Sequence, residues 1–113
     1  MARGAPLSVA LLWDSTALSE VGSVLQRVEL QMDVQRAFKG VTQPLSATLR
    51  GMMCINGHRH CGFFFDAVQR IWQWFDDSTL APVGEDWAAV INKCSLARYQ
   101  PLFLFYAVQS SSV

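Results

Sequence analysis

Three short apolar segments between residues 46 and 76 constrain the fold most. Residues 46–55 form the first segment, and Gly57 interrupts the apolar pattern directly after it. Residues 60–66 and 71–76 form the other two, with a short connection between them. Apolar and aromatic runs of this length, bounded by a few turn residues, are typical of antiparallel strands. The sequence therefore predicts a hairpin or meander over this part of the chain.

The other elements are predicted from apolar periodicity and from residues that begin or end helices. In the N-terminal part they are a buried strand over residues 7–13, a helix begun by Ser19 and Glu20, and a short helix from Asp33 to Gly40. The first helix has Val21, Val24, Leu25 and Val28 on its apolar face, and the second has Val34, Ala37 and Phe38 inward. In the C-terminal part they are a polar loop through Pro82 and Gly84, a helix from Glu85 to Cys94, and an interior strand from Pro101 to Val108. Together these elements predict an α+β fold, mainly antiparallel sheet with two or three short helices.

Composition and charge exclude several function classes. The chain has 113 residues, of which 51% are hydrophobic and 16% charged. An average domain has about 25% charged residues, so much of this surface must be apolar or covered. Nine Lys and Arg balance nine Asp and Glu without a basic run, which argues against nucleic acid. The apolar runs are too short for a membrane-spanning helix of roughly 20 residues.

The cysteines and the N-terminus indicate the compartment. Cys54, Cys61 and Cys94 are widely spaced and include no C-x-x-C pair, which fits a reducing environment. The N-terminal residues lack a convincing secretory signal. We therefore expect an intracellular protein, cytoplasmic or nuclear, that associates with neither nucleic acid nor membranes and uses no cofactor.

Five motifs carry a resemblance to a known family. Gly57 to His60 is similar to a Gly-His-Tyr box, Trp72 to Ser78 to a Trp-x-x-Phe-Asp-Asp-Ser motif, and Pro101 to Tyr106 to a closing Leu-x-Tyr strand. These motifs resemble the C-terminal half of the catalytic domain of ubiquitin-specific proteases, which are cysteine deubiquitinases. Leu11 to Ser15 and Gly51 to Cys54 resemble one divergent subgroup, often regarded as weakly active or inactive.

The resemblance implies a partial domain. Residues 7–108 would form the C-terminal part, which is the palm of a papain-like cysteine protease fold. Residues 1–6 would be a disordered N-terminus and residues 109–113 a tail. The implied partners are ubiquitin or a ubiquitinated protein, together with the missing N-terminal lobe or another protein. Such an exposed apolar interface predicts poor solubility of the isolated chain.

The position of the catalytic histidine is the open question. In the family the first box supplies this histidine, and the first Asp of Phe-Asp-Asp, here Asp76, orients it. Counting back from Asp76 by the family's usual spacing lands on Arg59, with His58 and His60 on either side. Strand side chains alternate between faces, so a displacement of one residue points an imidazole the wrong way. A gap of one residue in the connection 66–71 would instead restore His58 as the base, with His60 as its alternative.

Three functions remain possible on these residues. The family's nucleophile lies in a Gly-x-Thr-Cys-Tyr box that this chain lacks, so the first is a deubiquitinase-like fragment that carries the histidine and acid half and is inactive alone. The second is a non-catalytic ubiquitin- or protein-binding module. The third is a small zinc-binding protein that uses Cys54, His58, His60 and Cys61 as ligands, although the favoured interpretation contains no metal site.

Overall fold

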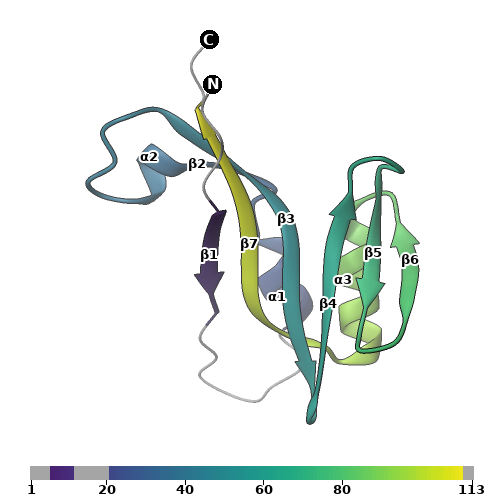
Figure 1. Ribbon diagram of the computed structural model, residues 1–113. Helices are drawn as coiled ribbons and strands as arrows, with labels where there is room; N and C mark the ends of the chain where they lie inside the picture. The colour runs from purple at the N-terminus through teal and green to yellow at the C-terminus, as the bar shows by residue number, and fades with distance from the viewer. Residues whose placement is uncertain (1–5, 12–20, 111–113) are drawn as a thin grey trace.

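The computed structural model describes residues 6–11 and 21–110 and has an α+β fold dominated by one antiparallel sheet (Figure 1). The strands are β1 (Pro6–Ala10), β2 (Gln31–Asp33), β3 (Leu45–Asn56), β4 (Arg59–Asp66), β5 (Ile71–Phe75), β6 (Leu80–Gly84) and β7 (Gln100–Ser110). The helices in the described residues are α1 (Val21–Gln26), α2 (Val34–Ala37) and α3 (Trp87–Ala97). The predicted fold class is therefore confirmed.

The sheet runs in the order β1-β7-β3-β4-β5-β6, and β2 pairs with β3 beside this path. Every pairing is antiparallel. The sequence from β3 to β6 is a meander, whereas β7 crosses back after α3 to lie between β1 and β3. The long apolar strand near the C-terminus is therefore interior, as predicted, and its continuous apolar character matches a position with neighbours on both sides.

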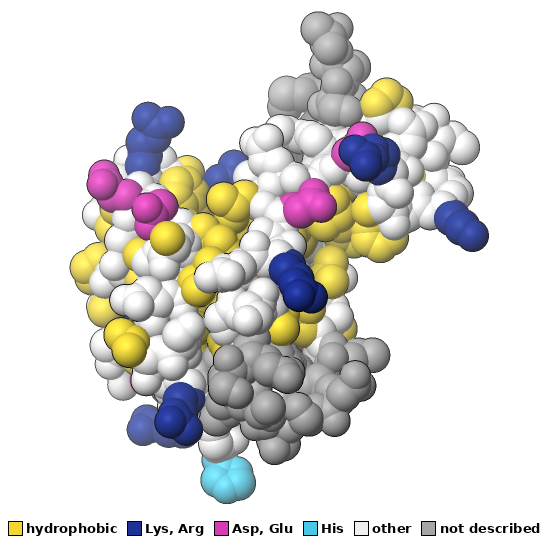
Figure 2. Space-filling view, turned by 180° about the vertical axis from the view of Figure 1, so that it is seen from behind, with side chains coloured by type: hydrophobic (Ala, Val, Ile, Leu, Met, Phe, Trp, Pro, Cys, Tyr) yellow, Lys and Arg dark blue, Asp and Glu magenta, His cyan; other side chains and the backbone are white. Residues whose placement is uncertain are grey.

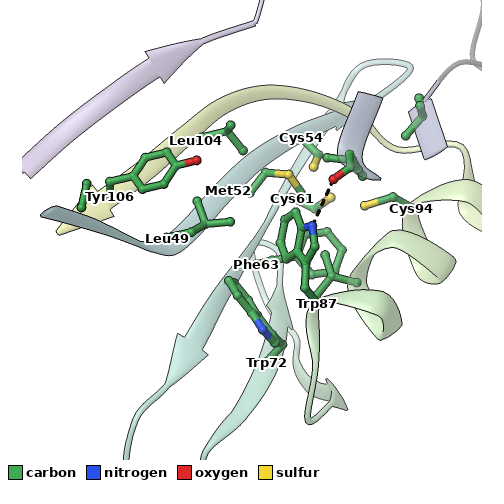
Figure 3. Close-up of a cluster of buried hydrophobic side chains, with 14 of the residues drawn as sticks. Leu49, Met52, Cys54, Cys61, Phe63, Trp72, Trp87, Cys94, Leu104 and Tyr106 are labelled. Atoms are coloured by element: carbon green, nitrogen blue, oxygen red, sulfur yellow. Dashed lines mark hydrogen bonds between the residues drawn. The ribbon is translucent and has the colours of Figure 1, made fainter. Parts of the chain in front are cut away.

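The helices α1 and α3 lie on one face of the sheet, behind it in the view of Figure 1. The indole N–H of Trp87 in α3 donates a hydrogen bond of 3.2 Å to the carbonyl of Leu25 in α1. Both residues belong to the core, which Figure 3 shows between the helices and the strands. The rings of Trp72 and Trp87 are 5.1 Å apart, so that β5 and α3 meet through their largest side chains.

Two turns in the meander are stabilised locally, one by its backbone conformation and the other by side-chain hydrogen bonds. Gly57 has a φ of 63° in the turn between β3 and β4, a conformation that glycine enters without steric cost. Asp66 closes the turn between β4 and β5, because its carboxylate accepts hydrogen bonds from the backbone N–H groups of Val68 and Gln69. These local interactions explain why the predicted strand boundaries agree with the structure to within one residue or two.

The predicted loop through Pro82 is wrong, because residues 80–84 form strand β6. Among the described strands, β6 pairs with β5 alone and is therefore an edge strand. An edge strand tolerates Pro82, since the missing N–H would face away from the ladder. The helix that follows begins at Trp87 rather than Glu85, because Asp86 is its N-cap and accepts a hydrogen bond of 3.1 Å from the backbone N–H of Ala89.

Other corrections concern burial near the ends of the chain. The short helix has Asp33 as its N-cap but spans only Val34–Ala37 rather than reaching Gly40, and Ala37 and Phe38 are exposed rather than inward. The first strand is not buried as predicted: it alternates half-buried and exposed residues, and within the described residues it pairs with β7 alone. The end of that predicted strand, residues 12 and 13, and the predicted helix start at Ser19 and Glu20 lie outside the described residues, as do residues 1–5 and 111–113. Strand β2 was not predicted.

Candidate functional site

A pocket of about 270 Å³ lies at the end of the sheet where β3 turns into β4 and where β5 ends. The hairpin turn between β3 and β4 contains Gly57 and His58, with Asn56 paired to Arg59. The side-chain amide of Asn56 donates to the carbonyl of Ala97 at 3.2 Å, which ties this hairpin to the end of α3. The residues that line the pocket come from three strands, β3, β4 and β5, and from the segments that follow β5 and α3: Asn56, Arg59, His60, Cys61, Trp74, Asp76 and Tyr99.

The ladder between β4 and β5 determines which side chains face Asp76. It pairs Gly62 with Phe75 and continues without a register shift to Asp66 and Ile71. Extended by one pair, the same register sets Cys61 opposite Asp76. Because side chains alternate along a strand, Arg59 and Cys61 share a face with Asp76, whereas His60 has the other parity. Continued in this way, the register would place an arginine and a cysteine on the side of the acid, although His60 lines the same pocket.

The structure brings only some of the predicted site residues together. His60 and Asp76 line the same pocket, whereas His58 lies exposed in the hairpin turn and does not line it. In the described part of the chain, no hydrogen bond or ion pair joins either histidine to Asp76. The Asp76 carboxylate instead accepts hydrogen bonds from the backbone N–H groups of Ser78 and Thr79, at 3.1 and 3.0 Å. The catalytic roles of His58, His60 and Asp76 stay predictions.

The zinc set predicted as an alternative does not converge. Cys54 and Cys61 are paired directly across β3 and β4 and both are buried, but His60 is paired with Ile55 and points from the opposite face. Residues 6–11 and 21–110 contain no group of three or more His, Cys, Asp or Glu side chains arranged to hold a metal ion. Alternation along the strands explains the failure, since adjacent ligands such as His60 and Cys61 face opposite sides of the sheet.

Sequence reasoning missed Tyr99, which forms a wall of the pocket together with Trp74. Their rings stack with centroids 6.4 Å apart, and the Lys93 ammonium lies 5.3 Å from the Trp74 ring. Burial raises the pKa of Tyr99, and the thiols of Cys61 and Cys94 add to the rise. Tyr99 follows α3 in the chain and reaches the pocket only because that helix packs against the sheet, so no local sequence signal could have found it.

The other sides of the molecule carry broader apolar hollows. Figure 2 shows the side on which the helices lie, where apolar side chains are exposed over much of the left half and the middle and charged side chains lie among them and at the edges. One hollow, of about 410 Å³, includes Phe65, Trp72 and Trp87, and another, of about 450 Å³, includes Val28, Phe38 and other residues between α1 and β7. On the face without helices, the exposed rings of Phe103 and Phe105 stack 6.4 Å apart. No helix in the described residues is long and apolar enough to cross a membrane.

The fold and the pocket define an antiparallel α+β unit whose hairpin turn and strand end enclose a polar cleft. No profile of a known protein family matches the chain. The chain is 30% identical over 105 residues to ubiquitin carboxyl-terminal hydrolase 53 of Homo sapiens. It is 31% identical over 105 residues to ubiquitin carboxyl-terminal hydrolase 54 of Rattus norvegicus and of Mus musculus. The chain is thus similar to a segment of ubiquitin carboxyl-terminal hydrolases, which supports a relationship to this deubiquitinase family.

The match covers most of this chain but only a small part of each relative. The matched region is 89% of this chain, but 10% of the human protein and 7% of each rodent protein. The chain therefore spans about a tenth or less of the length of these relatives.

Proposed function

We propose that this chain is the histidine- and acid-bearing part of a ubiquitin-specific protease domain of the divergent, weakly active kind, and that it does not hydrolyse ubiquitin conjugates by itself. Its role is to contact ubiquitin or a ubiquitinated protein without chemistry. The observation that carries the proposal is the β4–β5 ladder, which runs without a register shift from Gly62–Phe75 to Asp66–Ile71. Extended beyond its last pair, this register would set Arg59, rather than a histidine, on the face of Asp76. The similarity to the hydrolases supports the family side of the proposal.

The chemical reason is the requirement for a base. A cysteine protease needs an imidazole that takes the proton from the attacking thiol and returns it to the leaving group. A guanidinium stays protonated in proteins and cannot do this. In the proposed site Arg59 offers a fixed positive charge beside Asp76, so the pair would be a permanent electrostatic contact. A site of this kind can bind a partner but cannot catalyse hydrolysis.

A ubiquitin probe with a C-terminal electrophile tests the absence of chemistry. We expect the purified chain to form no covalent adduct with this probe beyond the slow labelling given by the same electrophile without ubiquitin. An active ubiquitin-specific protease serves as the positive control. Ubiquitin-dependent labelling of any cysteine in this chain would overturn the proposal.

Nuclear magnetic resonance tests which residue occupies the base position. We expect the imidazole signals of His58 and His60 to keep their chemical shifts in Asp76→Asn, because neither side chain is joined to that carboxylate. In Arg59→His the introduced imidazole should change its shift when Asp76→Asn is added. If the signal of His58 or His60 responds to Asp76→Asn and that of the introduced imidazole does not, then a native histidine occupies the base position beside Asp76 and the proposal is overturned.

The binding role rests on the apolar hollow that includes Phe65 and Trp72 and on the low share of charged residues. Titration of isotope-labelled chain with ubiquitin should shift signals around the pocket and this hollow. Arg59→Ala should weaken the binding, because it removes the exposed cation at the mouth of the pocket. Lys39→Ala removes an exposed cation far from the pocket in sequence and is the matched control. Absence of any shift at millimolar ubiquitin would refute the binding role.

A further inference from the structure

The three cysteines of the chain form one buried group that the proposed function does not use. Cys54 and Cys61 are directly opposite each other on β3 and β4, and Cys94 comes from α3. All three are free thiols and all are buried. Figure 3 shows them together beside Trp87, with Cys94 directed from the helix toward the other two. Cys54 therefore has both other thiols as neighbours within the core.

The pocket gives one of these cysteines access to solvent. Cys61 is 5% exposed and lines the pocket between β4 and the end of β5. Cys54 and Cys94 are completely buried and line none of the hollows described above. A small molecule that enters the pocket can therefore reach the sulfur of Cys61 first. Cys54 stands directly behind it.

The surroundings of Cys61 favour a thiolate. Its pKa is lowered chiefly because the Cys54 thiol can donate a hydrogen bond to it, and further by the indole N–H of Trp74 and the charge of Lys93, against the opposing effects of burial and Asp76. That indole nitrogen is the buried side-chain nitrogen left without a hydrogen-bond partner in the described residues. A thiolate at Cys61 would satisfy it.

Cys54 has the opposite tendency. Its pKa is strongly raised, first by the hydrogen bond to Cys61, then by that to Cys94 and by burial. Cys54 is therefore the proton donor of the pair as long as Cys61 is reduced. One nucleophilic sulfur at a pocket wall with a neutral thiol behind it is the arrangement of an attacking and a resolving cysteine.

We propose that Cys61 and Cys54 are a redox-active pair, in which a hydroperoxide entering the pocket oxidises Cys61 and Cys54 then closes a disulfide with it. The Cys61 thiolate attacks a peroxide oxygen, so that an S–O bond forms, the O–O bond breaks and hydroxide or alkoxide leaves. Cys61 is thereby oxidised to a sulfenic acid and the peroxide is reduced. The Cys54 sulfur then attacks the Cys61 sulfur, the S–S bond forms, and the Cys54 proton leaves with the sulfenic hydroxyl as water.

The backbone already has the spacing that this disulfide needs. Residues directly opposite each other in an antiparallel ladder have Cα atoms about 4.5 to 5.5 Å apart. Disulfides join Cα atoms that are usually about 4.4 to 6.8 Å apart. Cys54 and Cys61 are such a pair, so the bond requires little backbone movement. Cys94 comes from a helix on another layer and has no comparable registration with Cys61.

Peptide mapping after oxidation tests the proposal on the whole chain. The reduced protein is treated with hydrogen peroxide, blocked with N-ethylmaleimide in denaturant and digested. We expect one internal disulfide between Cys54 and Cys61, with Cys94 recovered as the maleimide adduct. In Cys54→Ser the oxidised Cys61 has no resolving partner and should be trapped by dimedone as a sulfenic acid. Cys94→Ser is the matched control and should form the same disulfide.

The reactivity of the thiols in the folded wild-type chain is a second test, and it requires no variant. In native buffer at pH 7, iodoacetamide should alkylate Cys61 of the wild-type chain faster than Cys94, since Cys61 lines the pocket and Cys94 is completely buried. Equal rates, a disulfide that includes Cys94, or only intermolecular disulfides would overturn the proposal. None of these outcomes depends on ubiquitin, so the pair and the proposed function can fail separately.

Discussion

Tyr106 offers a sharp test of how the C-terminal strand is held to the helical side of the sheet. Its side chain is 3% exposed, and its hydroxyl donates a hydrogen bond of 2.8 Å to the backbone carbonyl of Glu29, just after α1. Tyr106→Phe keeps the ring and removes this bond alone. A hydrogen bond of this kind contributes about 0.5 to 1.5 kcal/mol to stability. Glu29 is exposed, so water can reach its carbonyl, and we expect a loss of about 1 kcal/mol.

Unfolding in urea, followed by far-ultraviolet circular dichroism at pH 7, measures this loss. For a chain of 113 residues, about 1 kcal/mol corresponds to a fall in Tm of about 4 °C. Tyr99→Phe is the matched control, because no hydrogen bond of the Tyr99 hydroxyl is present in the described residues. We expect its effect to stay within about 0.5 kcal/mol.

The same variant tests a pH dependence. Burial, and then the Glu29 carboxylate, raise the pKa of Tyr106 above its ordinary value of 10.0. A raised pKa means that the folded state favours the neutral phenol, so this stability is present below about pH 10 and is lost as the pH rises through the folded pKa. The advantage of the wild type over Tyr106→Phe should therefore shrink between about pH 9 and 11. The reasoning is refuted if the two tyrosine variants lose equal stability at pH 7, or if the advantage grows with pH.

Three further predictions concern a turn, a close contact and the exposed face. The pKa of Asp66 is lowered, first by the backbone N–H of Gln69. Its contribution to stability is therefore present above about pH 4 and is lost as the pH falls, so that stability measured by urea unfolding should depend less on acid pH in Asp66→Asn. A Cβ at Gly84 would lie 2.6 Å from the Cβ of Ala89, so Gly84→Ala should cost about 1 to 3 kcal/mol in urea unfolding, and adding Ala89→Gly should recover part of that loss; additive losses would exclude the contact. Replacing both Phe103 and Phe105 by Thr removes the exposed stacked rings and should raise the concentration at which gel filtration still shows a single species, whereas an unchanged limit would mean that this face does not drive association.

The meander was predictable because its signals are local. Gly57 and the turn after Asp66 determine where strands end, and the apolar runs between them determine which residues pair. Strand β6 was missed because Pro82 argues against a strand unless the edge position is known, and that position is a property of the whole sheet. The exposure of Phe38 was missed for a related reason: a periodic pattern predicts a helix face but cannot say whether another element covers it.

The candidate site was predictable only in part. Counting residues along one hairpin gives Asp76 as the acid and leaves open whether Arg59 or a histidine occupies the base position. Cys94 and Tyr99 reach the pocket region from α3 and the residues after it, far from β4 in the sequence. Their approach depends on the packing of the helix, for which the spacing of residues in the chain has no signal. The pairing of Cys54 with Cys61 was within reach, because a two-residue turn at Gly57 fixes it.

The pairing of Gly62 with Phe75 underlies both the proposed function and the redox pair. With this register Arg59 and Cys61 face the same side as Asp76; a slip of one residue would turn both to the other face and expose Cys61 away from the pocket. Long-range nuclear Overhauser contacts between the backbones of Gly62 and Phe75 are therefore expected, in the reduced wild-type chain. If Gly62 instead contacts the backbone of the residue before or after Phe75, a histidine would replace the arginine on the acid's face, and Cys61 would lose the effect of Trp74 on its pKa while keeping its pairing with Cys54.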